Sequence, residues 1–174
     1  MCARRIELIY GGAASGKSGF AEAEALKCTA PFYYLATMRR GSETGDRRIK
    51  RHEMNRAGKG FITIECPVNI GNAADRIDGG TVLLECLTNL AANEMFTTDE
   101  HDDDLCDKIL QDVLTLGRKA ENLIIVSGDI MRDGEVYSKE TEAYIRLIGT
   151  LNTRLTAVSD KAYEIVYGCP KRIK

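Results

Sequence analysis

A glycine-rich segment near the start of the sequence has the residue types and spacing of a phosphate-binding loop. It reads GGAASGKS, after the apolar run Ile6–Tyr10 and before an amphipathic stretch. Glycines let the backbone turn its amides toward an anion, and a following helix adds its free N–H groups and its dipole. Lys17, the expected catalytic lysine, can reach the β and γ phosphates, and the Ser18 hydroxyl can ligate Mg²⁺. We therefore expect a nucleoside triphosphate to bind at Gly11, Gly12, Ala13, Ala14, Ser15, Gly16, Lys17 and Ser18.

Two carboxylates, Glu85 and Asp129, each follow an apolar run of the kind that forms a buried strand. Phosphoryl transfer needs an acidic group near the metal, and in an α/β fold that group lies at the carboxyl end of a neighbouring strand. Aspartate is the more usual residue in this role, so Asp129 remains a rival to Glu85. We expect Ser18 and Glu85 to be the protein ligands of Mg²⁺.

A basic segment, GDRRIKRHEMNR from Gly45 to Arg56, contains one of the two histidines of the chain. On a helix, Arg48, His52 and Arg56 share a face because they are four residues apart. Histidine suits a nucleotidyl carrier, since its covalent adduct is readily transferred again, and the arginines could hold a triphosphate. From these residues alone, a solvated, charged helix with an incidental histidine is the favoured interpretation, and the nucleotidyl carrier is the alternative. The other histidine, His101, precedes three aspartates and fits a solvated helix start better than a metal site.

The order of apolar and amphipathic stretches indicates an α/β fold with a mostly parallel sheet. Runs such as LIIV and TVLLE are apolar on both faces, as in strands buried between two helix layers. Strands that alternate with helices run parallel through right-handed crossovers. We expect strands at Ile6–Tyr10, Phe32–Ala36, Phe61–Glu65, Val82–Glu85, Leu123–Ser127 and Tyr163–Tyr167. We expect helices at Lys17–Cys28, Asp46–Arg56, Leu87–Phe96, Leu105–Ala120 and Lys139–Ser159.

The composition is that of an ordinary globular protein, with 174 residues, 44% of them hydrophobic, and a net charge of -2. We expect one nucleotide-binding domain over residues 1–174, and no nucleic-acid partner because there is no basic field. No apolar run is long enough to span a bilayer, and we see no signal peptide. The six cysteines form no C-x-x-C pair. We therefore expect reduced, structural thiols in a cytoplasmic protein, and no zinc site.

Several segments, taken in order, resemble one known family over nearly the whole chain. The phosphate loop is followed by YYLAT and by RRIKRH, which is similar to the family's Arg-Ile-x-x-His pattern. Next come ITIEC, with Glu65, and LLECLTNLAAN, with Glu85, Leu87, Thr88 and Asn93. GTLNTRL and YGCP are similar to the family's Gly-x-x-Asn-x-x-Leu and closing Gly-x-Pro. The chain thus resembles the bifunctional adenosylcobinamide kinase/adenosylcobinamide-phosphate guanylyltransferases of cobalamin assembly.

The resemblance implies a P-loop NTPase-like, three-layer α/β/α fold and two activities. The first phosphorylates adenosylcobinamide with ATP or GTP and Mg²⁺. The second takes GMP from GTP onto a histidine, here His52, and passes it to adenosylcobinamide phosphate, giving adenosylcobinamide-GDP. The implied partners are a corrinoid and a nucleoside triphosphate, and the implied assembly is a homotrimer. Beyond the phosphate loop, the implied nucleotide site comprises Ala36, Thr37, Met38, Glu53, Arg56, Glu65 and Glu85, with Arg48 and Arg51 as further phosphate contacts.

The sequence departs from the family after the fifth expected strand. Ser127–Ile130 and Gly134–Tyr137 stand where the family carries Asn-Glu-Val-Gly and Gly-Ile-Val-Pro. An altered corrinoid, or the loss of one of the two activities, would explain this departure. Two rival functions also stay open. One is a different small-molecule kinase that leaves His52 unused, and the other is a non-catalytic nucleotide sensor whose partner binds at the altered loop.

Overall fold

The computed structural model describes residues 4–41, 43–97, 102–130 and 137–174, and within these it leaves out the side chains of Thr44, Arg48, Asn55, Asp102 and Asp103. The elements in chain order are β1 (Arg5–Gly11), α1 (Lys17–Ala25), β2 (Phe32–Ala36), α2 (Glu43–Arg56), β3 (Phe61–Glu65), the 3₁₀ helix η1 (Ile70–Arg76), β4 (Thr81–Leu84), α3 (Leu87–Met95), α4 (Asp102–Lys119), β5 (Asn122–Gly128), α5 (Lys139–Val158), β6 (Lys161–Val166) and β7 (Cys169–Arg172). The expected strands and helices are all present, with ends shifted by a few residues at most.

One seven-stranded sheet organises the chain, in the order β3-β2-β4-β5-β1-β6-β7. Strands β1 to β6 pair in parallel, and only β7 runs antiparallel, against β6. The carboxyl ends of the six parallel strands therefore meet at one edge of the sheet, where ligands bind in this architecture. The expectation of an α/β fold with a mostly parallel sheet is confirmed.

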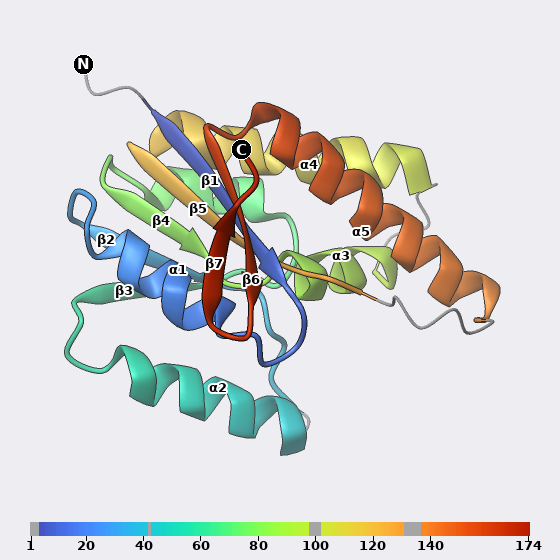
Figure 1. The fold of residues 1–174 in the computed structure, drawn as a ribbon, viewed down its shortest axis with the longest axis horizontal. Coiled ribbons are helices and arrows are strands. Elements are labelled where there is room, and N and C mark those ends of the chain that lie inside the picture. Colours follow the sequence, from blue (N-terminus) through green and yellow to red (C-terminus); the bar gives the residue numbers. More distant parts are fainter. Residues whose placement is uncertain (1–3, 42, 98–101, 131–136) are drawn as a thin grey trace.

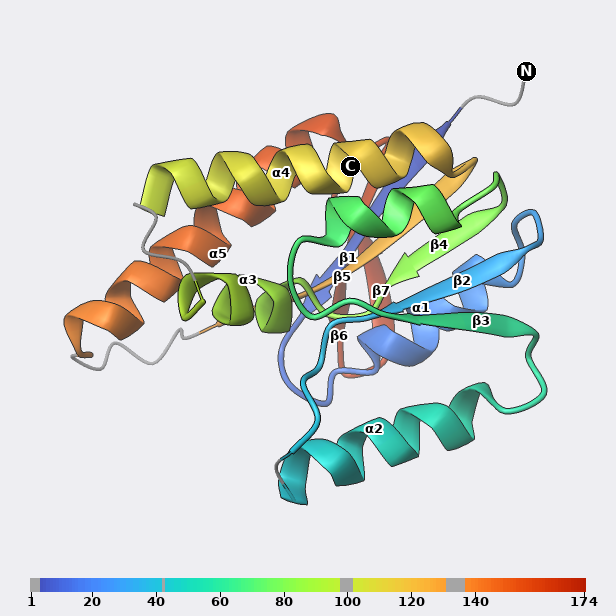
Figure 2. The same ribbon diagram turned by 180° about the vertical axis from the view of Figure 1, so that it is seen from behind.

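Helices cover both faces of the sheet, which makes three layers (Figures 1 and 2). The larger core lies between one face and η1, α3, α4 and α5, and it holds residues such as Leu84, Leu90, Ile109 and Leu151. The smaller core lies under α1 on the opposite face. Helix α2 stands beside that second face, and among the described residues none of its side chains belongs to either core (Figure 1). The described side chains of α2 are therefore available for polar contacts and not for packing in the hydrophobic cores.

The last two strands form a hairpin that the sequence did not predict. The strand expected to include Tyr167 ends at Val166, and Val166 pairs with Cys169 across a two-residue turn. Tyr167 and Gly168 both have positive φ, 49° and 79°, as a type I′ turn requires. The Gly168 amide donates to the Ser15 carbonyl at 2.8 Å, so the hairpin turn is fastened to the phosphate loop.

Gly11 lies where β1 enters the loop, and it leaves no room for a side chain. A Cβ there would lie 2.6 Å from the Ile165 carbonyl oxygen and 2.9 Å from Ser15 Oγ. At Gly12 a Cβ would meet nothing within 4 Å. Neither glycine has positive φ, so only the available space separates the two positions.

We predict that Gly11→Ala lowers the free energy of unfolding by about 1–3 kcal/mol, because the added methyl group must displace backbone or Ser15. Gly12→Ala is the matched control and should change stability by less than about 0.5 kcal/mol. Urea unfolding of the two variants measures both values. Equal stabilities would contradict the close packing of the loop against β6.

Candidate active site

The loop between β1 and α1 has no capping side chain that accepts hydrogen bonds from the first backbone amides of α1. Gly16, at φ 93°, is the N-cap of α1, which has no side-chain cap and no acidic residue in its first turn. Its amides and dipole are therefore directed at the space above the loop, which favours an anion. Lys17 Nζ lies over the same loop and donates to the Gly12 carbonyl at 3.0 Å. Ser15 Oγ is buried and, among the described residues, has no hydrogen-bond partner.

A cleft of about 690 Å³ opens above this loop. One wall is the loop, and the other is formed by α2, by the turn after it, and by the carboxyl ends of β4 and β5. The volume suits a nucleotide with a second small molecule. Its lining residues include Gly11, Ala13, Ala14, Ser15, Gly16, Lys17, Ser18, Met38, Arg51, His52, Lys59, Glu85, Cys86, Thr88, Asn89, Gly128 and Asp129.

The two side chains predicted for chemistry, His52 and Glu85, meet in this cleft. His52 Nε2 lies 3.5 Å from Glu85 Oε1, and both side chains are largely buried. Tyr34, from β2, hydrogen-bonds the same carboxylate, and burial followed by the Glu85 charge raises the pKa of Tyr34 far above its usual range. The tyrosine therefore stays protonated and donates to Glu85. His52 Nδ1 is buried and has no partner among the described residues.

The carboxyl-terminal half of α2 is held against the sheet by cationic side chains. The Arg56 guanidinium carbon lies 3.4 Å from the centroid of the Tyr34 ring, and Arg56 is only 7% exposed. Such a desolvated cation–π contact stabilises by about 2 kcal/mol. Just beyond the helix, Lys59 Nζ lies 2.7 Å from the buried Glu22 carboxylate of α1. These contacts position His52, which is one turn before Arg56.

A smaller pocket adjoins the cleft and shares Met38, His52 and Glu85 with it. The remaining lining residues come from the ends of β2 and β3 and from α2, namely Ala36, Arg40, Ile49, Glu53, Arg56, Thr63 and Glu65. Arg40 bridges two of the predicted nucleotide-binding carboxylates, at 2.9 Å from Glu53 and 2.7 Å from Glu65. All three side chains are about half exposed, so they form a charged rim that a ligand can reach.

Comparison with known proteins shows which family this chain belongs to. A family model described as cobinamide kinase / cobinamide phosphate guanyltransferase matches residues 7–173. The chain belongs to this family. The bifunctional adenosylcobalamin biosynthesis protein CobU of Salmonella typhimurium is 26% identical over 96% of this chain and 98% of its own length. The corresponding protein CobP of Pseudomonas aeruginosa is also 26% identical, over 97% of this chain and 96% of its own length.

A solved structure with a similar fold is the flagellar accessory protein FlaH from Methanocaldococcus jannaschii, with a TM-score of 0.50. It is 12% identical, and the match covers 100% of this chain and 80% of that chain. The P-loop NTPase-like fold expected from the sequence is confirmed. Membership of the cobinamide kinase / cobinamide phosphate guanyltransferase family also confirms the expectation of an enzyme with kinase and nucleotidyltransferase activities.

Two segments that carry the family resemblance have positioning roles. Asn93, on α3, donates through Nδ2 to the carbonyls of Thr37 (2.7 Å) and Pro67 (3.0 Å), so it joins the loops that follow β2 and β3. Asn152, on α5, accepts from Ser127 Oγ at 2.6 Å and donates to the Gly128 carbonyl at 3.3 Å. Asn93 therefore holds the loops after β2 and β3, and Asn152 holds the end of β5, which borders the cleft.

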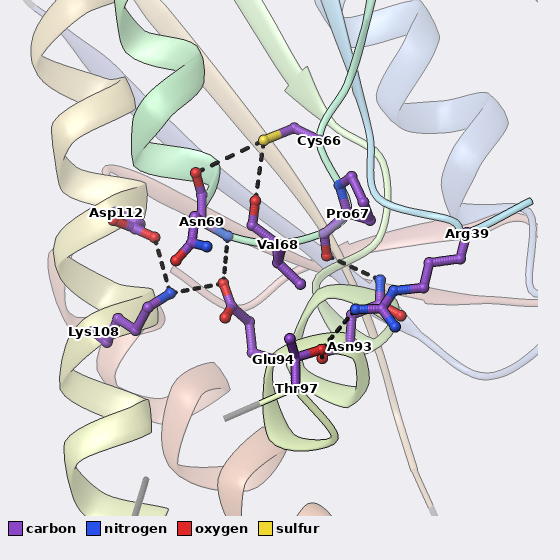
Figure 3. Close-up of polar contacts among 10 residues, drawn as sticks. All are labelled: Arg39, Cys66, Pro67, Val68, Asn69, Asn93, Glu94, Thr97, Lys108 and Asp112. Atoms are coloured by element: carbon purple, nitrogen blue, oxygen red, sulfur yellow. Dashed lines mark hydrogen bonds and ion pairs between the residues drawn. The ribbon is translucent and has the colours of Figure 1, made fainter. Parts of the chain in front are cut away.

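Figure 3 shows further polar contacts around Asn93 and the end of α3. Glu94 is buried next to Asn93, accepts from the Asn69 amide at 2.6 Å, and pairs with Lys108 of α4 at 2.8 Å. Arg39 donates to Thr97 at the end of α3. The turn after β2 is thus tied to α3 on both of its sides, which fixes the position of Met38.

The structure brings most of the predicted site residues together. All lie in the cleft or the smaller pocket except Gly12, which contributes a carbonyl, and Thr37. Thr37 is fully buried and donates to the Cys86 carbonyl, so its side chain faces the protein interior. Asp129, the rival acid, also lines the cleft. The Arg48 side chain, His101 and residues 131–136 of the altered loop lie outside what the structure describes.

Sequence reasoning missed Tyr34, Arg40 and Lys59. Tyr34 contacts Glu85 and Arg56, which are distant from it in the sequence. Arg40 likewise pairs with the distant Glu53 and Glu65. Lys59 follows α2 in a glycine-flanked turn, which could have indicated a lysine near the basic helix. No helix of the described residues is both long and apolar enough to cross a membrane.

We predict that Asn93→Ala lowers the free energy of unfolding by about 1–3 kcal/mol, because it leaves two backbone carbonyls without their donor. Asn89→Ala is the matched control one turn earlier on α3, where the side chain faces the cleft, and should change stability by less than about 0.5 kcal/mol. Thermal or urea unfolding checks both variants. A loss for Asn89→Ala as large as that for Asn93→Ala would contradict the positioning role.

Proposed function

We propose that this protein phosphorylates adenosylcobinamide and then converts the product to adenosylcobinamide-GDP through a guanylylated His52. The observation that carries the proposal is the single cleft that brings His52 and Glu85 to the phosphate loop with Lys17 and Ser18. Family membership supplies the substrate class, cobinamide and its phosphate. The adenosyl group on the corrinoid belongs to the proposal, and it rests on the resemblance and on the relatives' printed names.

In the kinase reaction, the substrate hydroxyl oxygen bonds to the γ-phosphorus of ATP or GTP. The bond from the γ-phosphorus to the bridging oxygen breaks, the nucleoside diphosphate leaves, and the hydroxyl proton passes to a base in the cleft or to water. The amides of the loop, with Lys17, hold the β and γ phosphates and neutralise the charge that develops on them. Positioning and electrostatics are the main contributions required of a protein in this chemistry.

In the guanylyl reaction, a ring nitrogen of His52 bonds to the α-phosphorus of GTP, and pyrophosphate leaves as the bridging bond breaks. Glu85, next to the imidazole, orients the ring and stabilises the positive charge that the ring acquires. A phosphate oxygen of the corrinoid phosphate then bonds to that phosphorus, the phosphorus–nitrogen bond breaks, and His52 is regenerated. Arg51, which lines the same cleft, is a phosphate contact in this step.

Ser18 and Glu85 are the residues proposed to hold Mg²⁺. They fit the ion because a hydroxyl and a carboxylate are hard oxygen donors, and water and substrate phosphates would supply its remaining ligands. When bound, Mg²⁺ would neutralise phosphate charge in either transfer.

Glu65 and the turn over Ala36 and Met38, at the smaller pocket, are proposed to hold guanine or ribose during guanylyl transfer. The pocket has a volume of only about 20 Å³, room for about one water, so it must open as Arg40 moves away from Glu65. It lies beside His52 and carries Glu65 at its rim, with Ala36 and Met38 in its wall. A carboxylate can accept from the N1–H and the 2-amino group of guanine together, which adenine cannot offer. Glu65 would then exchange its ion pair with Arg40 for these two hydrogen bonds. A cytoplasmic location and a homotrimer are also proposed, and both rest on sequence features and the family resemblance alone.

We predict that the protein incubated with GTP and Mg²⁺ gains the mass of one GMP, and that the adduct is acid-labile, as a phosphorus–nitrogen bond is. His52→Ala should form no adduct, while His101→Ala, which removes the other histidine, should form it as the parent does. Intact-mass measurement reads all three proteins. An adduct that persists in His52→Ala would move the nucleophile elsewhere, and nucleotide binding without any adduct would favour the rival kinase or the nucleotide sensor.

We predict that Glu85→Gln lowers both transfer rates about 100-fold or more and raises the Mg²⁺ concentration needed for half-maximal rate, because an anionic metal ligand is lost. Asp129→Asn, which removes the rival carboxylate from the same cleft, should have a smaller effect on the Mg²⁺ requirement. Rates measured over a Mg²⁺ titration separate the two variants. The reverse order would assign the metal to Asp129.

A further inference from the structure

Tyr167 is the most exposed large hydrophobic side chain among the described residues, at 96%. It forms the turn between β6 and β7 together with Gly168. Its φ of 49° lies in the left-handed region, where a bulky residue other than glycine is an outlier. Backbone strain of this kind is retained where a function requires the residue.

The fold itself gives no reason for a tyrosine at this position. A type I′ turn is formed best by Asn-Gly, and the tyrosine ring is not buried against any core. Tyr167 therefore has an unfavourable backbone conformation and no compensating internal contact for its ring. The side chain is suited to contact something outside the chain.

The turn is placed directly beside the phosphate loop. The Gly168 amide donates to the Ser15 carbonyl at 2.8 Å, and a Cβ on Gly16 would lie only 3.3 Å from Gly168 Cα. Strand β6 is parallel to β1, so the turn lies at the same carboxyl edge of the sheet as the loop. Glu85 lies on the other flank, because β5 and β4 follow β1 in that direction.

We propose that Tyr167 stacks on the base of the nucleotide that donates the γ-phosphoryl group. This assignment rests on the proposed kinase activity. The γ phosphate must face the cleft, where Glu85 lies and where the acceptor enters, so the nucleoside extends from the loop on the opposite flank. That flank is the β6–β7 turn. An aromatic ring stacks on any base, so this position accepts adenine and guanine alike, whereas the Glu65 flank has the hydrogen-bonding group that selects guanine.

The test compares binding of Mg²⁺-ATP and Mg²⁺-tripolyphosphate to the parent, Tyr167→Asn and Tyr167→Phe. Asparagine keeps or improves the type I′ turn while it removes the ring, so Tyr167→Asn should melt at the same temperature as the parent or higher. Its affinity for ATP should fall about tenfold, the loss of one base–aromatic stack. Its affinity for tripolyphosphate, which has no base, should stay within about twofold. Tyr167→Phe should bind both ligands as the parent does.

Phe96→Asn removes a different exposed aromatic, at the end of α3, and should leave the ATP affinity unchanged. Parental ATP affinity in Tyr167→Asn would overturn the assignment, and so would an equal loss for tripolyphosphate, which would mean a damaged loop. Unchanged ATP affinity with a smaller oligomer would instead place Tyr167 between copies of the chain. A parent protein that binds neither ligand would overturn the proposed function as well, so the two failures are distinguishable.

Discussion

A carboxylate buried at the end of β4 is the constraint on which the site depends. A buried charge is costly unless it is hydrogen-bonded and paired, yet among the described residues no lysine or arginine forms an ion pair with Glu85. The Tyr34 hydroxyl and the His52 imidazole are its neighbours instead. Glu85 therefore requires a further positive partner, which either Mg²⁺ or a charged histidine intermediate would supply. The same carboxylate thus serves the proposed metal and the proposed nucleophile.

The order of the strands gives the two sides of the phosphate loop different roles. On the β5 and β4 side, the cleft continues to His52, Glu85 and the charged rim of the smaller pocket. On the β6 side, the loop is packed against backbone, as the close approach of Gly11 to Ile165 shows. The first side carries the groups proposed for the chemistry, while the second anchors the loop and carries Tyr167 at the β6–β7 turn. A bifunctional enzyme that binds nucleotides for two different transfers can use both flanks of a single loop.

Short sequence patterns predicted the elements whose conformation depends mainly on neighbouring residues. The phosphate loop, the start of α1 at Lys17 and the buried strands follow from short patterns of glycine and apolar residues. The antiparallel strand β7 was missed because CPKR is polar, contains proline and has no alternation, and because Tyr-Gly is not a usual turn signal. The 3₁₀ helix η1 is too short for a periodic pattern to reveal it.

Contacts between distant segments were beyond sequence reasoning, and they decide where α2 lies. Its basic residues suggested phosphate contacts, yet Arg56 stacks on Tyr34 and is almost fully buried. Because none of the described side chains of α2 belongs to the hydrophobic cores, the helix is held by this stack and by ion pairs around it. Partly exposed ion pairs stabilise by no more than about 1 kcal/mol each. The loop wall of the cleft is therefore fixed by close packing, while the wall that carries His52 is fixed by polar contacts, which a phosphate-bearing ligand can exchange for its own.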